Sequence, residues 1–160
     1  MSLSDHLIFK FLWAFGLLAL LAVGLLACRS HPRVVISTKS GEQLALQVEV
    51  ADTPAKRSLG LQYRNELGDD QGMLFLFPSQ GAQSFWMKNT PLPLDMIFIG
   101  SDLKIVGIIR QAVPFSTTSL TVPAPSQFVL EIKGGLSRRK GIEVGNRVRF
   151  ENISLEGIEG

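Results

Sequence analysis

Short apolar runs separated by Gly, Pro, Asn or Ser dominate the chain from residue 73 to residue 153. Runs this short, rich in β-branched and aromatic residues, predict strands. The 160 residues are enough for one domain of ordinary size. The fold class expected is therefore α+β and mainly antiparallel β, a small barrel or sandwich with one short helix. The runs are MLFLF, SFWMKN, LDMIFI, LKIVGII, QFVLEI and RVRFENI.

Two more strands precede these runs. VVIST and QLALQVEV are separated by a turn signal at Ser40-Gly41, which predicts a hairpin over about residues 34–38 and 43–50. Residues 112–125 are rich in Pro, Ser and Thr and predict a long surface loop. Farther along, GGLSRRKG suggests a helical turn, and Gly145-Asn146 suggests a tight turn.

The segment DTPAKRSLGLQYR is the best helix candidate. Thr53 or Asp52 can cap it, and Pro54 suits a first helical turn. Gly60 weakens the helix, and the apolar residues do not follow a clean helical period. We expect a short helix over about residues 54–63.

The N-terminal residues have the layout of a secretory signal peptide, with Lys10 before a charge-free run from Phe11 to Ala27. Leu25-Leu26-Ala27-Cys28 resembles the lipobox of bacterial lipoproteins, and Cys28 is the only cysteine. This resemblance implies that residues 1–27 are removed and that lipid on Cys28 anchors the protein to a membrane. Residues 28–33 would then be a tether, and residues 34–155 a single β-rich domain.

An uncleaved transmembrane anchor or an ordinary signal peptide is the alternative, although the apolar run is short for a membrane span. The localisation that we expect is extracytoplasmic and membrane-anchored. In a host with two membranes it would lie on the periplasmic side of the outer or inner one. Arg29, which follows the cysteine and is not acidic, favours the outer membrane.

Composition excludes several classes of function. The formal net charge is +2, and Arg138, Arg139 and Lys140 form the one short basic cluster, so no nucleic-acid partner is expected. His31 is the only histidine outside the signal, which disfavours a zinc site or a catalytic triad. We expect no cofactor and no metal, and the absence of nucleophile or phosphate-binding motifs makes an enzyme the less favoured reading.

The stretch FWMKNTPLPLDMIFIG places charges among apolar residues. We interpret residues 84–89 and 94–99 as a hairpin, because Pro91 and Pro93 cannot donate to a ladder and belong in the turn. In that register Lys88 faces Asp95, and Trp86 lies beside them on the same face. The other face holds Phe85, Met87, Leu94, Met96 and Phe98.

Two readings of this arrangement remain open. One is a structural cross-strand ion pair, worth about 0.2–1 kcal/mol when exposed. The other is a polar floor beside an aromatic wall, which suits a small ligand. Asn89 and Thr90 can hydrogen-bond the turn backbone in both readings.

Five segments, in order along the chain, resemble the domain-of-unknown-function 192 family. They are RSLGLQYR, GMLFLF, FWMKNTPLPLDMIFI, VLEIKGG and GIEVGNRVRF, and the match covers roughly residues 34–150. The resemblance implies a compact β-rich domain, often with a signal or lipid anchor, and no established activity. Gln62 and Asn146 depart from the common family residues Met and Asp. The matched positions are Arg57, Gly60, Leu61, Arg64, Gly72, Met73, Phe75, Trp86, Met87, Lys88, Asn89, Thr90, Pro93, Asp95, Glu131 and Gly135.

Three cations and two carboxylates among these positions could act together. Arg57 and Arg64 are seven residues apart, so a continuous helix would place them on one face. With Lys88, Asp95 and Glu131 they would form either a buried structural network or a ligand site. The candidate ligand-binding residues are Arg57, Arg64, Trp86, Lys88, Asn89, Asp95 and Glu131.

The function expected is binding of a small polar ligand or of an envelope protein by a membrane-anchored lipoprotein. One alternative is a hydrolase acting on a carbohydrate-like substrate, with Asp95 and Glu131 as paired carboxylates tuned by Lys88. Another is a structural or assembly factor that uses an exposed apolar patch. Phe115, Leu120 and Val122 in the long loop are the candidates for that patch.

Overall fold

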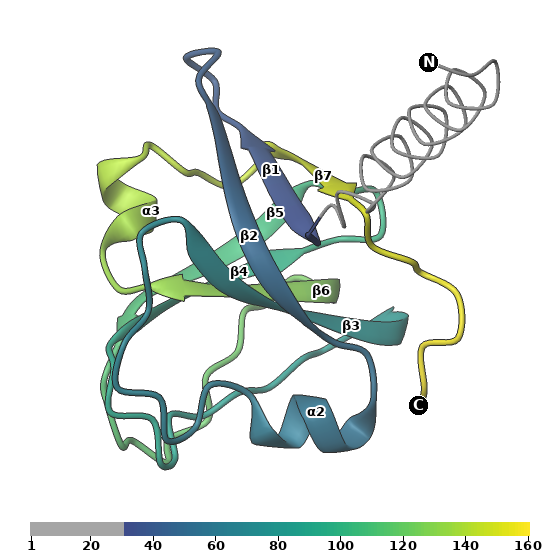
Figure 1. Cartoon of the computed structure of the whole chain (residues 1–160). Coiled ribbons are helices and arrows are strands. Elements are labelled where there is room, and N and C mark those ends of the chain that lie inside the picture. The colour runs from purple at the N-terminus through teal and green to yellow at the C-terminus, as the bar shows by residue number, and fades with distance from the viewer. Residues whose placement is uncertain (1–30) are drawn as a thin grey trace, which may run out of the picture. The chain divides into compact units, whose positions relative to one another are not determined.

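One seven-stranded sheet organises the part of the chain that the computed structural model describes, residues 31–160 (Figure 1). The strand order is β5-β4-β6-β3-β2-β1-β7, and every neighbouring pair is antiparallel except β2 and β3. This confirms the predicted class, α+β and mainly antiparallel. The strands are β1 Arg33–Ser37, β2 Gln43–Ala51, β3 Gln71–Gly81, β4 Leu94–Ile99, β5 Ile105–Ala112, β6 Ser126–Lys133 and β7 Arg147–Glu151.

The sheet curls into a half-barrel, and its two edge strands meet at one end. Near the start of β5, the amide of Ile105 donates to the carbonyl of Asn146 (3.0 Å), and the amide of Gly145 donates to the carbonyl of Ile105 (2.8 Å). The amide of Val148 in β7 donates to the carbonyl of Leu103 (2.8 Å). These bonds cover part of the exposed edges that an open sheet would leave.

Apolar side chains cover both faces of the sheet. Along β4, Ile97 and Ile99 point into the half-barrel, whereas Met96 and Phe98 point outward, as strand alternation requires. The inner cluster consists of Val34, Ile36, Leu46, Val48, Leu74, Leu76, Ile97, Ile99, Ile105, Phe128, Leu130, Ile132, Leu136, Ile142 and Val148. The outer cluster consists of Ala51, Leu61, Leu67, Met73, Phe75, Met87, Leu94, Met96, Phe98, Ala112 and Val129.

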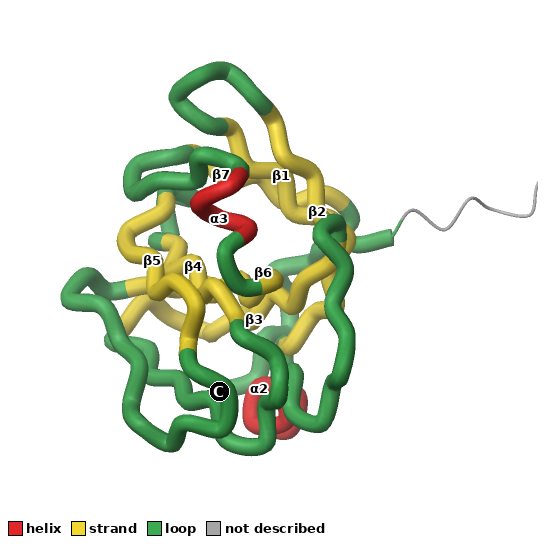
Figure 2. The backbone as a smooth tube through the Cα atoms, turned by 90° about the vertical axis from the view of Figure 1, so that its left-hand side faces the viewer, coloured by secondary structure: helices red, strands yellow, loops and turns green. Residues whose placement is uncertain are grey.

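Helix α2, Pro54–Leu59, lies on the outer side of the sheet (Figure 2). The Thr53 hydroxyl accepts from the amide of Lys56 (3.3 Å), which confirms the predicted cap. The helix is shorter than predicted because Gly60 has φ 52°, a conformation that favours glycine, and its amide closes the last turn on the Lys56 carbonyl. Arg64 therefore lies outside the helix and does not share a helical face with Arg57.

Helix α3, Leu136–Arg139, is the helical turn expected from GGLSRRKG. Leu136 belongs to the inner cluster, so α3 covers the inner side of the sheet, and Figure 2 shows β3 and β6 between the two helices. The predicted hairpin at residues 34–50 is formed by β1 and β2. Residues 113–125 connect β5 to β6 without a strand, as expected of the long loop.

The predicted hairpin of residues 84–89 with β4 is wrong. Both edges of β4 are occupied, by β5 and by β6. Residues 84–87 instead meet the long loop: Phe85 and Leu120 exchange two backbone hydrogen bonds (2.9 and 2.8 Å), and the Met87 amide donates to the Ser116 carbonyl (2.8 Å). A turn follows, in which Asn89 has φ 54°, and residues 90–93 then lead into β4.

The assignment of side chains to faces was nevertheless correct for the apolar residues. Met87, Leu94, Met96 and Phe98 all belong to the outer cluster, and Phe85 packs against it. The predicted neighbours Lys88 and Asp95 are not paired, because the two segments do not lie in register. Lys88 is exposed, whereas Asp95 is fully buried.

All seven strands, α2, α3 and both clusters lie within residues 31–160, which group as one self-contained unit by their contacts. A fragment of these residues therefore carries the whole described fold. No helix in this part of the chain is long and apolar enough to cross a membrane. The predicted signal peptide and the lipid site at Cys28 lie outside the described residues.

Candidate functional site

A cavity of about 410 Å³ opens on the outer side of the sheet. Its walls come from α2 and the turn after it, from residues 84–90 and from the long loop, and its floor comes from β3 and β6. A volume of this size suits a small organic ligand. The lining residues are Arg57, Ser58, Leu59, Gly60, Leu61, Gln62, Phe75, Phe77, Ser84, Phe85, Trp86, Thr90, Thr117, Ser119 and Glu131.

Aromatic rings form one wall of this pocket. Phe85 packs edge-to-face against Phe75, with ring centroids 5.0 Å apart, and against Phe77 at 6.3 Å. Trp86 lies at the mouth and is 52% exposed. The ammonium group of Lys88 lies 5.5 Å from the centre of the Trp86 ring, a distance at which a cation is attracted to the ring face.

Glu131 is the buried polar group of the pocket. It lies on β6 between Leu130 and Ile132, which point inward, and it therefore faces the outer side with Val129. Only 4% of its surface is exposed, and it forms no hydrogen bond or ion pair with any residue from 31 to 160. Burial raises the pKa of the Glu131 carboxyl to about 8. At neutral pH the group is thus protonated and can donate a hydrogen bond.

Arg57 is the only other charged side chain among the described residues that line this pocket. Its guanidinium donates to the backbone carbonyls of Leu76 (2.9 Å), Asp52 (3.2 Å) and Glu159 (2.7 Å). It also lies 5.2 Å from the centre of the Phe77 ring. These contacts hold α2, β3 and the C-terminal segment together, so Arg57 shapes the rim of the pocket.

Asn89 joins two segments of the pocket wall. Its side-chain amide donates to the Gln62 side-chain oxygen (3.0 Å) and to the Tyr63 hydroxyl (2.8 Å). The Tyr63 amide in turn donates to the Asn89 carbonyl (2.8 Å). Arg64 lies outside the pocket lining, where its guanidinium pairs with the Glu49 carboxylate at 2.5 Å on the surface.

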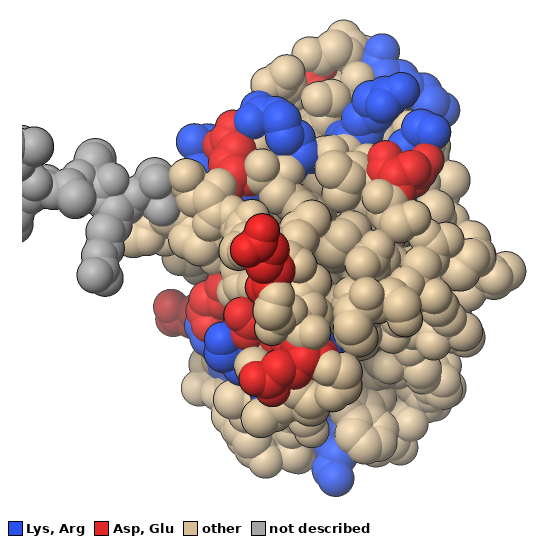
Figure 3. Space-filling view, turned by 90° about the vertical axis from the view of Figure 1, so that its right-hand side faces the viewer, with Lys and Arg blue, Asp and Glu red and all other residues tan. Residues whose placement is uncertain are grey.

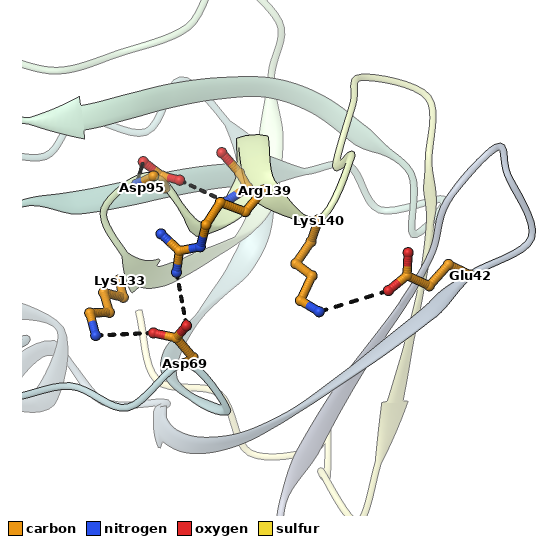
Figure 4. Close-up of polar contacts among 8 residues, drawn as sticks. Glu42, Asp69, Asp95, Lys133, Arg139 and Lys140 are labelled. Atoms are coloured by element: carbon orange, nitrogen blue, oxygen red, sulfur yellow. Dashed lines mark hydrogen bonds and ion pairs between the residues drawn. The ribbon is translucent and has the colours of Figure 1, made fainter.

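Asp95 lies on the inner side of the sheet, at the start of β4. One carboxylate oxygen accepts from the amides of Gln111 (2.8 Å) and Gly135 (2.9 Å), and the other accepts from the amide of Ser137 (2.9 Å). Gly135 has φ 82°, and a bulge in β5 brings the Gln111 amide to the same carboxylate. Asp95 therefore fastens the start of α3 to the sheet (Figure 4).

Asp95 and Glu131 face opposite sides of the sheet. Met96 of β4 lies directly opposite Glu131 and faces the same side of the sheet. Asp95 comes immediately before Met96 in β4, so its side chain points to the other side. The two groups of a carboxylate pair must flank one bond of the substrate, so Asp95 and Glu131 cannot act together as the paired carboxylates of a hydrolase. The buried network of three cations and two carboxylates, one of the two alternatives considered, is not formed among these residues: Arg57 donates to backbone carbonyls, Arg64 pairs with Glu49, and Lys88 is exposed.

Surface ion pairs near α3 use other charged residues. Asp69 pairs with Lys133 (3.0 Å) and Arg139 (2.9 Å), and Lys140 lies 3.8 Å from Glu42 (Figure 4). Lys133, followed by Arg139, holds the pKa of the Asp69 carboxyl below its usual range. Within residues 31–160, no group of three or more His, Cys, Asp or Glu side chains is arranged to hold a metal ion.

The apolar patch expected in the long loop is not continuous. Phe115 is 64% exposed, but Leu120 and Val122 pack against the outer cluster. Sequence reasoning also missed Phe75, Phe77 and Phe85 as pocket walls. The usable signal was the single acid in the apolar strand FVLEI, because an ionisable group on a buried face needs either a partner or a cavity.

Comparison with known proteins confirms the family. The chain belongs to the domain-of-unknown-function 192 family, whose model, described as "Uncharacterized ACR", matches residues 35–150. None of the curated proteins matches the chain.

Two solved structures are similar to the chain. One is a crystal structure of a protein of unknown function from Novosphingobium aromaticivorans, 42% identical, with a TM-score of 0.71; the match covers 73% of this chain and 83% of that one. The other is described as a "putative transcription regulator" from Sinorhizobium meliloti, 41% identical, with a TM-score of 0.72; the match covers 76% of this chain and 94% of that one.

Proposed function

We propose that this member of the domain-of-unknown-function 192 family binds a small uncharged molecule in the pocket above Glu131. The observation that carries the proposal is a buried carboxyl group, without a partner among the described residues, at the floor of an aromatic-walled cavity. Buried polar groups are normally hydrogen-bonded, and those that are not often mark a site of function.

The residues that line the pocket indicate the chemistry of its ligand. Because the Glu131 carboxyl is protonated at neutral pH, it complements a hydrogen-bond acceptor such as a carbonyl or ether oxygen. Phe85 and Trp86 offer ring faces and edges for an apolar ring or chain. Hydroxyl groups of Ser58, Thr117 and Ser119 near the mouth suit further polar substituents.

Ligand-observed NMR with matched compounds tests this proposal on the fragment 31–160. Ring compounds that carry a carbonyl group are compared with analogues in which a methylene group replaces the oxygen. One buried hydrogen bond is worth about 1.4 kcal/mol, so the carbonyl compounds should bind roughly tenfold more tightly. Trp86 is the only tryptophan of the fragment, and its fluorescence reports binding at the pocket mouth independently.

Two variants assign the preference to Glu131. Glu131→Gln keeps a donor at every pH, so it should keep the preference for the carbonyl compound; Glu131→Leu should lose it. In the wild type, the preference should disappear above about pH 8, where the carboxyl ionises and can no longer donate. Equal binding of both compounds by all three proteins would refute the role of Glu131.

A membrane anchor on Cys28 is the second part of the proposal. The support is the apolar run that ends in Leu25-Leu26-Ala27-Cys28. When the full chain is expressed in a bacterium that processes lipoproteins, we expect it in the membrane fraction, with a mass increase from lipid on the peptide that begins at Cys28. Cys28→Ser should remove that modification. Wild-type protein of unmodified mass would exclude lipidation, and the uncleaved anchor would remain.

The description of the Sinorhizobium meliloti protein raises DNA binding as another function for this chain. Within residues 31–160 the two helices have six and four residues, too short to provide the usual recognition helix. The face in Figure 3 carries Lys and Arg interspersed with Asp and Glu, toward the top and lower down, with wide uncharged surface beside them. These features favour a small-molecule ligand over a polyanion.

A further inference from the structure

Glu131 lies in a row with two methionines. On β6 it is directly opposite Met73 of β3 on one side and Met96 of β4 on the other. Directly opposite residues of antiparallel strands share a face and have Cβ atoms about 4.5–5.5 Å apart. Two thioether side chains therefore flank the carboxyl group across three adjacent strands.

The methionines of the chain are concentrated around this row. Apart from Met1, the chain has Met73, Met87 and Met96, and all three belong to the outer cluster. Met73 is 7% exposed, and Met87 and Met96 are fully buried. Methionine commonly fills gaps in apolar cores. Gap filling does not explain why Glu131, which has no partner among residues 31–160, lies between Met73 and Met96.

We propose that Met73, Met96 and Glu131 form a binding site for a soft monovalent metal ion, Cu(I) or Ag(I). Thioether sulfur selects such ions over harder ones. One carboxylate balances the single positive charge, and buried charges in proteins are either paired or coordinate metals. Glu131 lines the pocket, so an ion can reach its carboxyl group from solvent. Met73 and Met96 do not line the pocket but lie opposite Glu131 on the two neighbouring strands.

Glu131 binds the ion as a carboxylate, so any proton that the carboxyl group carries is released to solvent when the ion binds. No electron is transferred, and Ag(I) can therefore stand in for Cu(I) without an added reductant. This inference does not rest on the proposed organic ligand, although both use Glu131.

The fragment 31–160 gives a clean background for a silver titration. It lacks Cys28 and Met1, and His31→Ala removes its only imidazole. Methionine methyl groups labelled with ¹³C are followed by NMR in chloride-free buffer, with native mass spectrometry for stoichiometry. We expect one ion per chain and shifts of the Met73 and Met96 methyl signals.

Substitutions in the row provide the decisive comparison. Met73→Leu, Met96→Leu and Glu131→Gln should each weaken silver binding by roughly tenfold or more. Met87→Leu makes the same change in the same cluster but outside the row, so it should leave the affinity within about twofold. Circular dichroism confirms that each variant is folded.

Either of two results would overturn the site: no binding tighter than about 10 µM, or an affinity that the row variants leave unchanged. Neither result affects the organic ligand, which is measured without silver. Conversely, if the wild-type fragment showed no preference for the carbonyl compounds, the silver titration would still test the metal site independently.

Discussion

Asp95→Ala is expected to lower the free energy of unfolding of the fragment 31–160 by about 4 kcal/mol. The carboxylate is fully buried and accepts from three backbone amides, those of Gln111, Gly135 and Ser137. Alanine leaves all three donors without an acceptor in the interior, and each such loss costs about 1–3 kcal/mol. Because two of the donors belong to the start of α3, that helix should detach from the sheet first. Urea unfolding measures the loss, and amide hydrogen exchange locates it.

Two further variants test whether the loss of stability in Asp95→Ala comes from the hydrogen bonds to the carboxylate. Asp95→Asn keeps one acceptor oxygen but turns an NH₂ group toward the third amide, so it should lose about half as much stability. Asp102→Ala removes an exposed aspartate whose partner is Lys104 on the surface, and it should leave the urea midpoint unchanged. If Asp95→Ala behaved like Asp102→Ala, the anchoring of α3 by this carboxylate would be wrong.

Local signals predicted most of the elements correctly. Thr53 and Pro54 marked the start of α2, and Ser40-Gly41 marked the first hairpin. Strand alternation also assigned Met87 and Met96 to one face, because that information is contained in neighbouring residues. The predicted end of α2, at about residue 63, was wrong because Gly60, with its positive φ of 52°, ends the helix at Leu59.

Strand pairing could not be read in the same way. Residues 84–89 and β4 are adjacent in sequence, which favoured a hairpin, but β4 pairs with β5 and β6. Phe85 instead exchanges backbone hydrogen bonds with Leu120 of the long loop. Pairing depends on which distant strands compete for an edge, and local periodicity contains no information on this competition.

The same limit applies to the charged residues. An isolated acid in each of two apolar strands identified Asp95 and Glu131 as unusual positions. The partners of Asp95 are backbone amides. Every residue except proline has such a group, so the sequence does not show which residues bind Asp95. Glu131 faces a cavity whose walls come from α2, residues 84–90 and the long loop, so only the assembled fold defines its surroundings.

The stability of the fragment should fall as pH rises from about 5 to about 8, and Glu131 should cause most of this fall. Burial raises the pKa of its carboxyl from the ordinary value of 4.5 to about 8 in the folded state. Between these values the folded protein holds a proton that the unfolded chain has released. The contribution of Glu131 is therefore fully present below pH 4.5 and is lost as pH rises through 8, at roughly 1.4 kcal/mol per pH unit.

Glu131→Gln isolates this contribution, because the amide has a similar shape and does not titrate. Urea unfolding of both proteins at several pH values should show the variant gaining about 4 kcal/mol relative to the wild type between pH 5 and pH 8. Groups common to both proteins cancel in the difference. Asp52, Asp69 and Asp102, whose pKa values are lowered, titrate below this range. A difference independent of pH would mean that the Glu131 carboxyl is ionised in the folded protein, which would remove the hydrogen-bond donor from the pocket floor.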